Sequence, residues 1–257
     1  MPKQCNTGFC ESRREPLADY LANRDFVSSS QLRRFGKLGL TASQLADGGM
    51  VTGTVMGEAF HALVLEPEVF SEHYLVLADV DHEQQSPPEG ELMQRTWLDA
   101  WQWSALSNGR DALLAYRQFP VAELISGGTK ELSIYWTDEV GACWKARPDC
   151  FTRDIVLDLK TTGDCRPDAF KRTRERFGYD LQAAHYVEAV TRLTGNTPRF
   201  AFLAVELNAP YSVWVHELEA GEIHAARLQI DQLKHAYVAA IKAAVDAPRA
   251  GSSKARP

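Results

Sequence analysis

The chain has 257 residues, of which 45% are hydrophobic, 24% charged and 10% aromatic. This composition is typical of a soluble globular protein and excludes a chain that is disordered over most of its length. The formal net charge of −6 argues against a protein that coats nucleic acid with a broad basic surface. Five cysteines without a C-x-x-C pair, a polar N-terminus and no long apolar run lead us to expect a cytoplasmic protein with reduced thiols and no membrane segment.

Two helices are expected in the first quarter of the chain. Ser28 and Gln31 have the spacing of a capping box, which predicts a short helix beginning there. A second helix is expected over 54–66, where the apolar residues share one broad face and Pro67 marks the end. His61 lies on this helix, close to Gly57 and Glu58.

The next segment alternates between loop and helix. Residues 79–91 are acidic and contain two adjacent prolines, so we expect a surface loop. Two helical stretches are predicted to follow, over 92–104 and 109–119, with tryptophan and leucine side chains available for packing. The first part of the chain, about 1–125, is therefore expected to form an N-terminal helical layer.

The middle of the chain changes to the period of strands. Residues 131–136 and 142–147 alternate like paired strands, with 138–141 as the hairpin turn. The segment 155–159 is rich in branched residues, which favours a strand at the centre of the sheet. A mixed sheet therefore begins in this region.

The remaining elements complete an α/β or α+β fold. A helix is expected over 179–193 and closed by Gly195, followed by a second hairpin over 199–207 and 211–218 and a terminal helix over 222–245. We expect one domain over 1–247, with the catalytic core at about 126–247. The small, basic tail 248–257 is expected to be disordered.

Two aspartates and a lysine in the middle of the chain form the candidate site. Asp149 ends one predicted strand, and Asp158 and Lys160 stand two apart on the next, so these two side chains point to the same face while Leu159 points to the core. Two close carboxylates suit a hard divalent ion, and a neighbouring lysine can orient a water or stabilise charge on phosphorus. The structural alternative is a salt bridge at the end of a strand.

Four blocks of sequence in fixed order favour the functional interpretation. They are 28–33, 57–67, the acid-acid-lysine segment 145–162, and 178–186. Together they make the sequence resemble the PD-(D/E)xK nuclease superfamily, and within it the exonuclease VIII-like branch of phages and prophages. The resemblance implies a restriction-endonuclease-like fold, a mixed central sheet flanked by helices, with divalent-metal cleavage of DNA phosphodiesters.

The resemblance also assigns roles within the candidate site. Asp149 and Asp158 correspond to the metal-binding carboxylates and Lys160 to the catalytic lysine, with the main-chain carbonyl of Leu159 as a further ligand. His61 matches a helical histidine beside the metal; otherwise it is a satisfied core residue. Glu58 is a weaker candidate, acting behind the ligands or simply solvated.

Three further polar residues are assigned less directly. Gln182 and Tyr186 share one helical face with Tyr179, and we expect Gln182 to reach the scissile phosphate or the attacking water and Tyr186 to line the DNA channel. The alternative for the tyrosines is core packing. Glu131 heads the strand before the motif, where related nucleases sometimes place an extra acidic ligand, and it is equally compatible with a structural role.

Two basic or hydroxyl-rich segments are candidates for contact with DNA. Ser28, Ser30 and Arg33 have groups that suit a terminal phosphate, although helix capping explains them equally well. The segment 166–176 follows the catalytic strand and contains five basic residues. We expect it to follow a DNA backbone, with a solvated helix face as the alternative. Its candidate residues are Lys171, Arg172 and Arg174.

The cofactor expected from the resemblance is Mg²⁺, with Mn²⁺ accepted by the same oxygen ligands. Related nucleases that carry an iron–sulfur cluster use a late cysteine triplet, and no cysteine follows Cys165 here, so we expect no cluster. The chain contains no G-x-x-x-x-G-K-[ST] loop, so ATP is not implied.

The expected function is a metal-dependent exonuclease that digests linear double-stranded DNA in the 5′ to 3′ direction during phage-type recombination. The resemblance alone implies this polarity, a ring-shaped homo-oligomer, and transfer of the remaining strand to a single-strand annealing protein. One alternative is a single-strand-specific or structure-specific nuclease of the same superfamily. Another is a non-catalytic protein that binds DNA ends.

Overall fold

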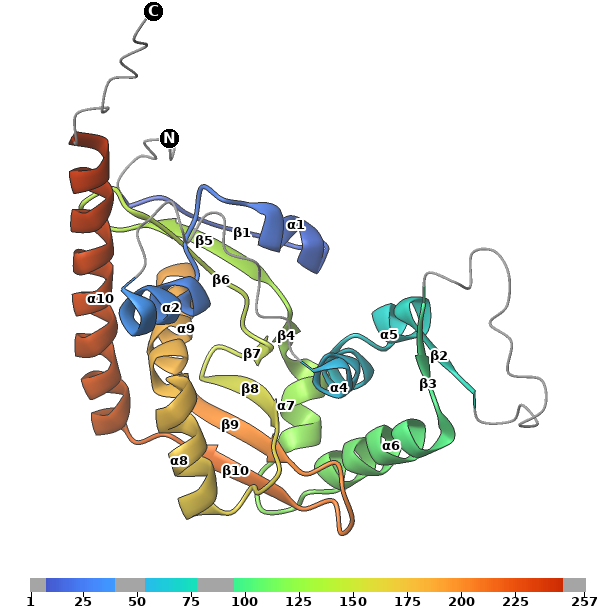
Figure 1. Ribbon diagram of the computed structural model, residues 1–257. Coiled ribbons are helices and arrows are strands. Elements are labelled where there is room, and N and C mark those ends of the chain that lie inside the picture. Colours follow the sequence, from blue (N-terminus) through green and yellow to red (C-terminus); the bar gives the residue numbers. More distant parts are fainter. Residues whose placement is uncertain (1–7, 40–53, 78–94, 247–257) are drawn as a thin grey trace, which may run out of the picture.

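A computed structural model describes residues 8–39, 54–77 and 95–246 (Figure 1). At its centre is a five-stranded mixed sheet with the strand order β10-β9-β8-β7-β4. β8 and β9 run parallel, and the other neighbouring strands run antiparallel. The strands of this sheet are β4 (Thr129–Lys130), β7 (Cys150–Phe151), β8 (Ile155–Thr161), β9 (Arg199–Val205) and β10 (Val213–Glu217). The expected central position of β8 is therefore confirmed.

Two smaller sheets accompany the central one. An antiparallel sheet has the order β1-β5-β6, and β2 pairs with β3 in parallel. The predicted hairpin forms between β5 and β6, and Asp138 closes its turn by accepting main-chain hydrogen bonds from Val140 and Ala142. These strands are β1 (Cys10–Arg13), β2 (Tyr74–Val76), β3 (Thr96–Leu98), β5 (Ser133–Thr137) and β6 (Cys143–Ala146).

Helices cover both faces of the central sheet (Figure 1). One face packs against α2 (Ser29–Leu38), α8 (Pro167–Phe177), α9 (Tyr179–Thr194) and α10 (Ala220–Asp246). The other packs against α4 (Val55–Leu65), α5 (Pro67–His73), α6 (Ala100–Leu114) and α7 (Val121–Gly127). The short helix α1 (Leu17–Ala22) instead packs through Tyr20 against Tyr135 of β5. The helices of the N-terminal half thus lie on both sides of the sheet rather than in one layer.

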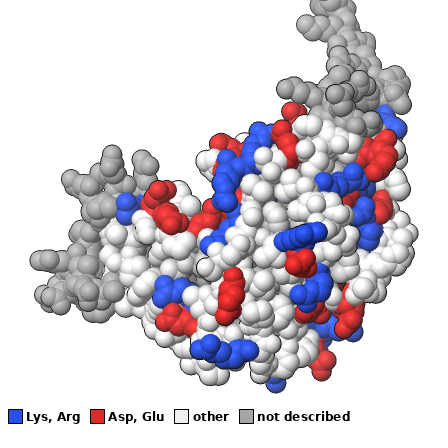
Figure 2. All heavy atoms as spheres, turned by 180° about the vertical axis from the view of Figure 1, so that it is seen from behind, with Lys and Arg blue, Asp and Glu red and all other residues white. Residues whose placement is uncertain are grey.

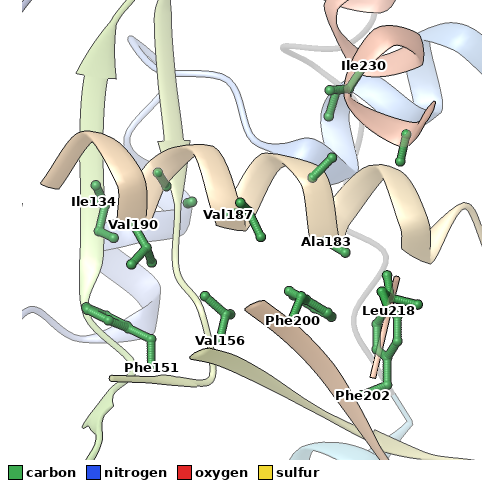
Figure 3. Close-up of a cluster of buried hydrophobic side chains, with 14 of the residues drawn as sticks. Ile134, Phe151, Val156, Ala183, Val187, Val190, Phe200, Phe202, Leu218 and Ile230 are labelled. Carbon is green, nitrogen blue, oxygen red and sulfur yellow. The ribbon is translucent and has the colours of Figure 1, made fainter. Parts of the chain in front are cut away.

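Helix α9 lies across the sheet and forms the main core on that face. Figure 3 shows Ala183, Val187 and Val190 of this helix above Val156 and Phe200 of the sheet. Ile230 of α10 packs from the opposite side of α9. Because α9 is packed on two sides, its polar residues that point toward β8 are held in fixed positions.

The alternation of β8 separates its apolar and polar side chains. Ile155, Leu157 and Leu159 point into the core on the α4 side. Asp158 and Lys160 point to the α9 side, as the strand period predicts, because successive side chains of a strand face opposite ways. The end of β8 that carries Asp158 and Lys160 therefore lies under the first turns of α9.

The structure corrects the prediction for residues 92–119. In place of two helices, β3 is followed by one helix, α6, which runs without a break through 105–108. Asp99 and Gln102 form a capping box that starts α6 after the strand. The tryptophans in this segment carry no periodic signal strong enough to separate a strand from a helix, and the cap was the informative feature.

Other expected elements are confirmed with small changes in their ends. The capping box of Ser28 and Gln31 is present, the 179–193 helix is α9 with Gly195 after it, and the second hairpin is formed by β9 and β10. Strand β1, which pairs with β5, was not expected. The predicted loop 79–91 and tail 248–257 lie outside the described residues. Within the described ranges, no helix has the length and apolarity that crossing a membrane requires.

Candidate active site

The first aspartate of the motif is tied directly to the strand that carries the second. Asp149 precedes β7, which pairs antiparallel with β8. The Asp149 carboxylate, through Oδ2, accepts a hydrogen bond of 2.6 Å from the main-chain N–H of Leu159. This bond fixes Asp149 beside the segment of β8 that contains Asp158 and Lys160.

The second aspartate is fully buried between a lysine and a glutamine. Asp158 Oδ2 forms an ion pair with the Nζ of Lys160, and Asp158 Oδ1 accepts a 3.0 Å hydrogen bond from Gln182 Nε2. The same Gln182 amide nitrogen donates to the hydroxyl of Tyr186 at 3.0 Å. The structure therefore brings together Asp158, Lys160, Gln182 and Tyr186, the set expected from the sequence.

A second group of ligand-type atoms lies next to this pair. One ligand atom each from His61, Glu131 and Asp149 lies within 4.8 Å of the other two. His61 Nε2 lies 2.6 Å from the carbonyl oxygen of Leu159, and its Nδ1 lies 3.5 Å from Asp149 Oδ2. This donor set of two carboxylates, an imidazole and a main-chain carbonyl fits a divalent ion such as Mg²⁺ or Mn²⁺. The nearby Asp149 charge acts on the carboxyl of Asp158, which places Asp158 beside this group.

The electrostatics of the site favour an added cation. Burial and the neighbouring Asp149 carboxylate raise the pKa of Glu131. Burial also raises the pKa of Asp158, while the Lys160 ammonium acts in the opposite direction. Burial and like charge thus disfavour the ionised forms of these carboxyls, and a divalent ion among them would offset both effects. The residues present therefore fit a metal on electrostatic grounds as well as by their donor atoms.

Lys160 is held in its charged form. Burial alone would lower its pKa, but the carboxylates of Asp158 and Asp149 outweigh burial, and the net shift is upward. Its Nζ also lies 5.0 Å from the centre of the Tyr179 ring. Lys160 thus contributes a fixed positive charge beside the aspartates.

One residue of the site was not singled out from the sequence. Arg147 is buried, and its Nε donates a 2.7 Å hydrogen bond to Glu131 Oε2. Its Nη1 donates to the carbonyl oxygen of Glu15 and to the hydroxyl of Ser133. Arg147 therefore orients Glu131, which itself has a positive φ of 49°. The available signal was its spacing, since Arg147 stands two residues before Asp149.

The candidate phosphate-binding residues near the N-terminus divide into two kinds. The Ser28 side chain is engaged in the capping box of α2, as the structural alternative predicted. Ser30 is exposed, and its hydroxyl accepts a 3.2 Å hydrogen bond from Arg33 Nη2. The Arg33 guanidinium carbon lies 5.9 Å from the centre of the Tyr179 ring, whose other cationic neighbour is Lys160. Arg33 therefore shares the Tyr179 ring with Lys160, and Ser30 lies beside Arg33.

The basic segment 166–176 forms helix α8, and its three candidate residues differ. Lys171 and Arg172 are exposed. Arg174 is buried and paired with Asp180 and Glu222 at 2.8 Å each, so its charge is used inside the protein. This finding corrects the expectation that Arg174 follows a DNA backbone.

The described surface carries charges of both signs. Figure 2 shows one face of the molecule, on which lysine and arginine side chains are interspersed with aspartate and glutamate. The described part of this face therefore offers no broad basic surface to a polyanion.

Comparisons with known proteins agree with this geometry. The chain belongs to a family described as a PDDEXK-like domain of unknown function (DUF3799), whose model matches residues 28–255. A crystal structure of a "Putative exonuclease" from Eubacterium rectale is similar with a TM-score of 0.58 and 17% sequence identity over 88% of each chain. At this identity the likeness shows a shared fold. A search of curated proteins found no match. The expected PD-(D/E)xK fold and superfamily are thus confirmed.

Proposed function

We propose that the protein is a divalent-metal-dependent DNA exonuclease that hydrolyses phosphodiester bonds at the ends of linear double-stranded DNA. The observation that carries this proposal is the convergence of Asp149, Asp158 and Lys160 at the end of β8, with His61 and Glu131 beside them. A protein that only binds DNA has no need for this buried set of carboxylates. Lys160 and Arg147 supply two positive charges for the three carboxylates of Glu131, Asp149 and Asp158, so their burial is only partly offset.

The ion would be held by Asp149, Glu131, His61 and the carbonyl oxygen of Leu159, with Asp158 adjacent. When bound, it supplies Lewis acidity and positive charge at the scissile phosphate. The Lys160 ammonium would add a second positive charge, on a side chain of the protein, where negative charge develops on phosphorus. Gln182 holds Asp158 in position through its 3.0 Å hydrogen bond.

The overall reaction is a hydrolysis. The oxygen of a water forms a bond to phosphorus in line with the bond that breaks, between phosphorus and the 3′ oxygen. The 3′ oxygen leaves with a proton, and the product carries a 5′ phosphate. One of the carboxylates of Glu131, Asp149 and Asp158 would take the proton that the attacking water loses. The leaving 3′ oxygen would take its proton from a solvent water, so that the net reaction adds one water across the P–O bond.

The finer specificity is also part of the proposal. Ser30 and Arg33 lie beside the Lys160 and Tyr179 contact, where they suit the terminal phosphate of a strand. This position supports action on DNA ends. The 5′ to 3′ polarity rests on the sequence resemblance. A ring-shaped homo-oligomer and transfer of the product strand to a single-strand annealing protein in phage-type recombination complete the proposal and rest on the sequence resemblance.

The direct test is the Mg²⁺-dependent release of nucleotides from 5′-phosphorylated linear duplex DNA. A closed circle of the same sequence is the control for end dependence, and Lys160→Ala is the control for the site. Lys242→Ala, which changes an exposed lysine of α10, is the matched control variant. We expect degradation of the linear DNA alone, by the wild type and Lys242→Ala. Cleavage of the circle would contradict the exonuclease assignment.

The same assay separates the alternatives. Release from single-stranded or nicked DNA, with blunt duplex left intact, would indicate a single-strand-specific or structure-specific nuclease. Binding of DNA ends without hydrolysis in Mg²⁺ or Mn²⁺ would indicate a non-catalytic end-binding protein.

A further inference from the structure

Two aromatic rings meet at the turn between α8 and α9, next to the catalytic lysine. Phe177 is the last residue of α8 and Tyr179 the first of α9, and their rings stack with centroids 5.6 Å apart and planes at 21°. Gly178 between them has a φ of 65°, and a Cβ at this position would lie 3.2 Å from Arg33 Cδ. A glycine is therefore needed there, and the turn holds the two rings in a defined arrangement.

The rings form a column from the core to the solvent. The Tyr179 ring lies 6.0 Å from the ring of Phe202, which is fully buried. Phe177, at the outer end, is 50% exposed. A single exposed hydrophobic residue is common on protein surfaces, so exposure alone carries no argument. Phe177 differs because it stacks on Tyr179, whose ring is in turn in tilted contact with the buried ring of Phe202.

Three cations lie beside the two outer rings of this column. Lys160 Nζ lies 5.0 Å and the Arg33 guanidinium carbon 5.9 Å from the centre of the Tyr179 ring. The Arg176 guanidinium carbon lies 5.3 Å from the centre of the Phe177 ring. Arg33 also donates a 2.8 Å hydrogen bond to the main-chain carbonyl of Phe177. The turn thus offers ring surface for bases and positive charge for phosphates.

We propose that Phe177 and Tyr179 form a stacking platform for unpaired nucleobases of the strand that enters the active site. Aromatic surface beside cations is the combination with which proteins bind single-stranded nucleic acid without reading its sequence. Inside a duplex the faces of the bases are covered by their neighbours, so the platform selects terminal or unpaired nucleotides. This inference rests on the proposed function and deepens it, because it names the form of DNA that the site receives.

The test uses a short single-stranded oligonucleotide that contains one 2-aminopurine, whose fluorescence is quenched when it stacks. Binding is measured with Ca²⁺ in place of Mg²⁺, and electrophoresis confirms that the oligonucleotide stays intact. The variants are Phe177→Ala, Phe177→Leu and Phe177→Trp, with Trp101→Ala as the matched control. Trp101 is also exposed, at 63%, but lies on α6 on the other side of the sheet. Thermal unfolding of each variant confirms that it folds.

We expect Phe177→Ala and Phe177→Leu to bind the oligonucleotide about 5- to 150-fold more weakly than the wild type. The decrease in 2-aminopurine fluorescence that accompanies binding to the wild type should be absent in both variants. Phe177→Trp should retain both properties because it preserves an aromatic face, and Trp101→Ala should bind like the wild type. Retained affinity and quenching in Phe177→Leu would overturn the proposal, since leucine keeps an apolar surface without a ring.

The outcomes separate this inference from the proposed function. If the wild type releases nucleotides but Phe177→Ala has the same KM for DNA, the proposal of a stacking platform is wrong and the proposed nuclease function is retained. If no DNA is hydrolysed while quenching still depends on an aromatic residue at position 177, the nuclease is wrong and the platform stands in a DNA-binding protein.

Discussion

Asp149 Oδ2 accepts a 2.6 Å hydrogen bond from the main-chain N–H of Leu159, between the two other charged residues of the motif. The bond joins the residue before β7 to β8 and holds Asp149 level with Asp158. Asp149, a proposed metal ligand, is therefore positioned by a main-chain hydrogen bond rather than by side-chain contacts alone.

Replacing Gln182 with leucine should impair both activity and stability. The Oδ1 atom of buried Asp158 would lose the donor that it has at 3.0 Å, which should cost about 1–3 kcal/mol of unfolding free energy. We expect a decrease in nuclease activity of about 10- to 100-fold, because Asp158 would no longer be held in position. Urea denaturation and a steady-state assay measure the two effects. Gln229→Leu, at an exposed position of α10, is the control, and an equal effect there would contradict the assigned role.

Removal of a proposed ligand should weaken metal binding. Asp149→Asn and His61→Ala each take one donor from the group around Leu159, and we expect at least about a tenfold weaker affinity for Mn²⁺ in isothermal titration calorimetry. His73→Ala, at an exposed histidine of α5, should bind Mn²⁺ like the wild type. Wild-type affinity in both ligand variants would show that the ion binds elsewhere.

Two adjacent glycines at the end of α7 should respond differently to alanine. A Cβ at Gly128 would lie 2.4 Å from Cys150 Sγ and 2.6 Å from the carbonyl oxygen of Leu124, whereas nothing lies within 4 Å of one at Gly127. We expect Gly128→Ala to lose about 1–3 kcal/mol, which corresponds to a melting temperature lower by several degrees. Gly127→Ala should be neutral or slightly stabilising. Equal melting temperatures for the two variants would contradict the packing at this turn.

The buried Glu188 should make stability depend on pH in acid. Burial alone would raise its pKa, but Lys234 and Arg227 lower it to about 2, below its ordinary value of 4.5. A carboxylate whose pKa is lowered by folding stabilises the protein above about pH 4.5, and this contribution disappears as the pH falls toward 2. Burial also lowers the pKa of Lys234. The ion pair therefore contributes less to the free energy of unfolding than the pKa shift of Glu188 alone implies.

Glu188→Gln should therefore lower the free energy of unfolding by about 3 kcal/mol at pH 7, because Lys234 is left buried without its partner. The difference in unfolding free energy between this variant and the wild type, measured by urea denaturation, should become smaller between pH 4.5 and pH 3. Glu217→Gln breaks only an exposed pair with Arg199 and should cost less than about 1 kcal/mol. A difference that stays constant down to pH 3 would contradict the assigned ion pair.

The parts of the site that the sequence predicts are those set by local periodicity. Alternation in β8 places Asp158 and Lys160 on one face and Leu159 on the other, and the helical spacing of Gln182 and Tyr186 brings both side chains toward Asp158. The signals for α8 were also present, since Pro167 stands in its first turn and Gly178 follows its end, but the charge of the segment obscured them.

The parts that could not be predicted depend on contacts between distant segments. His61 meets the carbonyl of Leu159 across 98 positions of sequence, and no periodicity specifies how a helix is placed over a strand. Arg174 has the composition of a surface residue, and only its pairing with Asp180 and Glu222 shows that it is internal. Resemblance to a family supplied the first of these relationships, and only the structure supplied the second.

The most direct test of the central claim is the single-turnover rate of nucleotide release from linear duplex DNA by Asp158→Asn, compared with Asp154→Asn. Each substitution replaces an aspartate by asparagine, and the two positions are four residues apart, just before β8 and within it. Asp158 is fully buried beside Lys160, whereas Asp154 is exposed. We predict a loss of about 100-fold or more for Asp158→Asn and a wild-type rate for Asp154→Asn. Equal rates in the two variants, or no release of nucleotides by the wild type in Mg²⁺ or Mn²⁺, would contradict a nuclease that acts through this site.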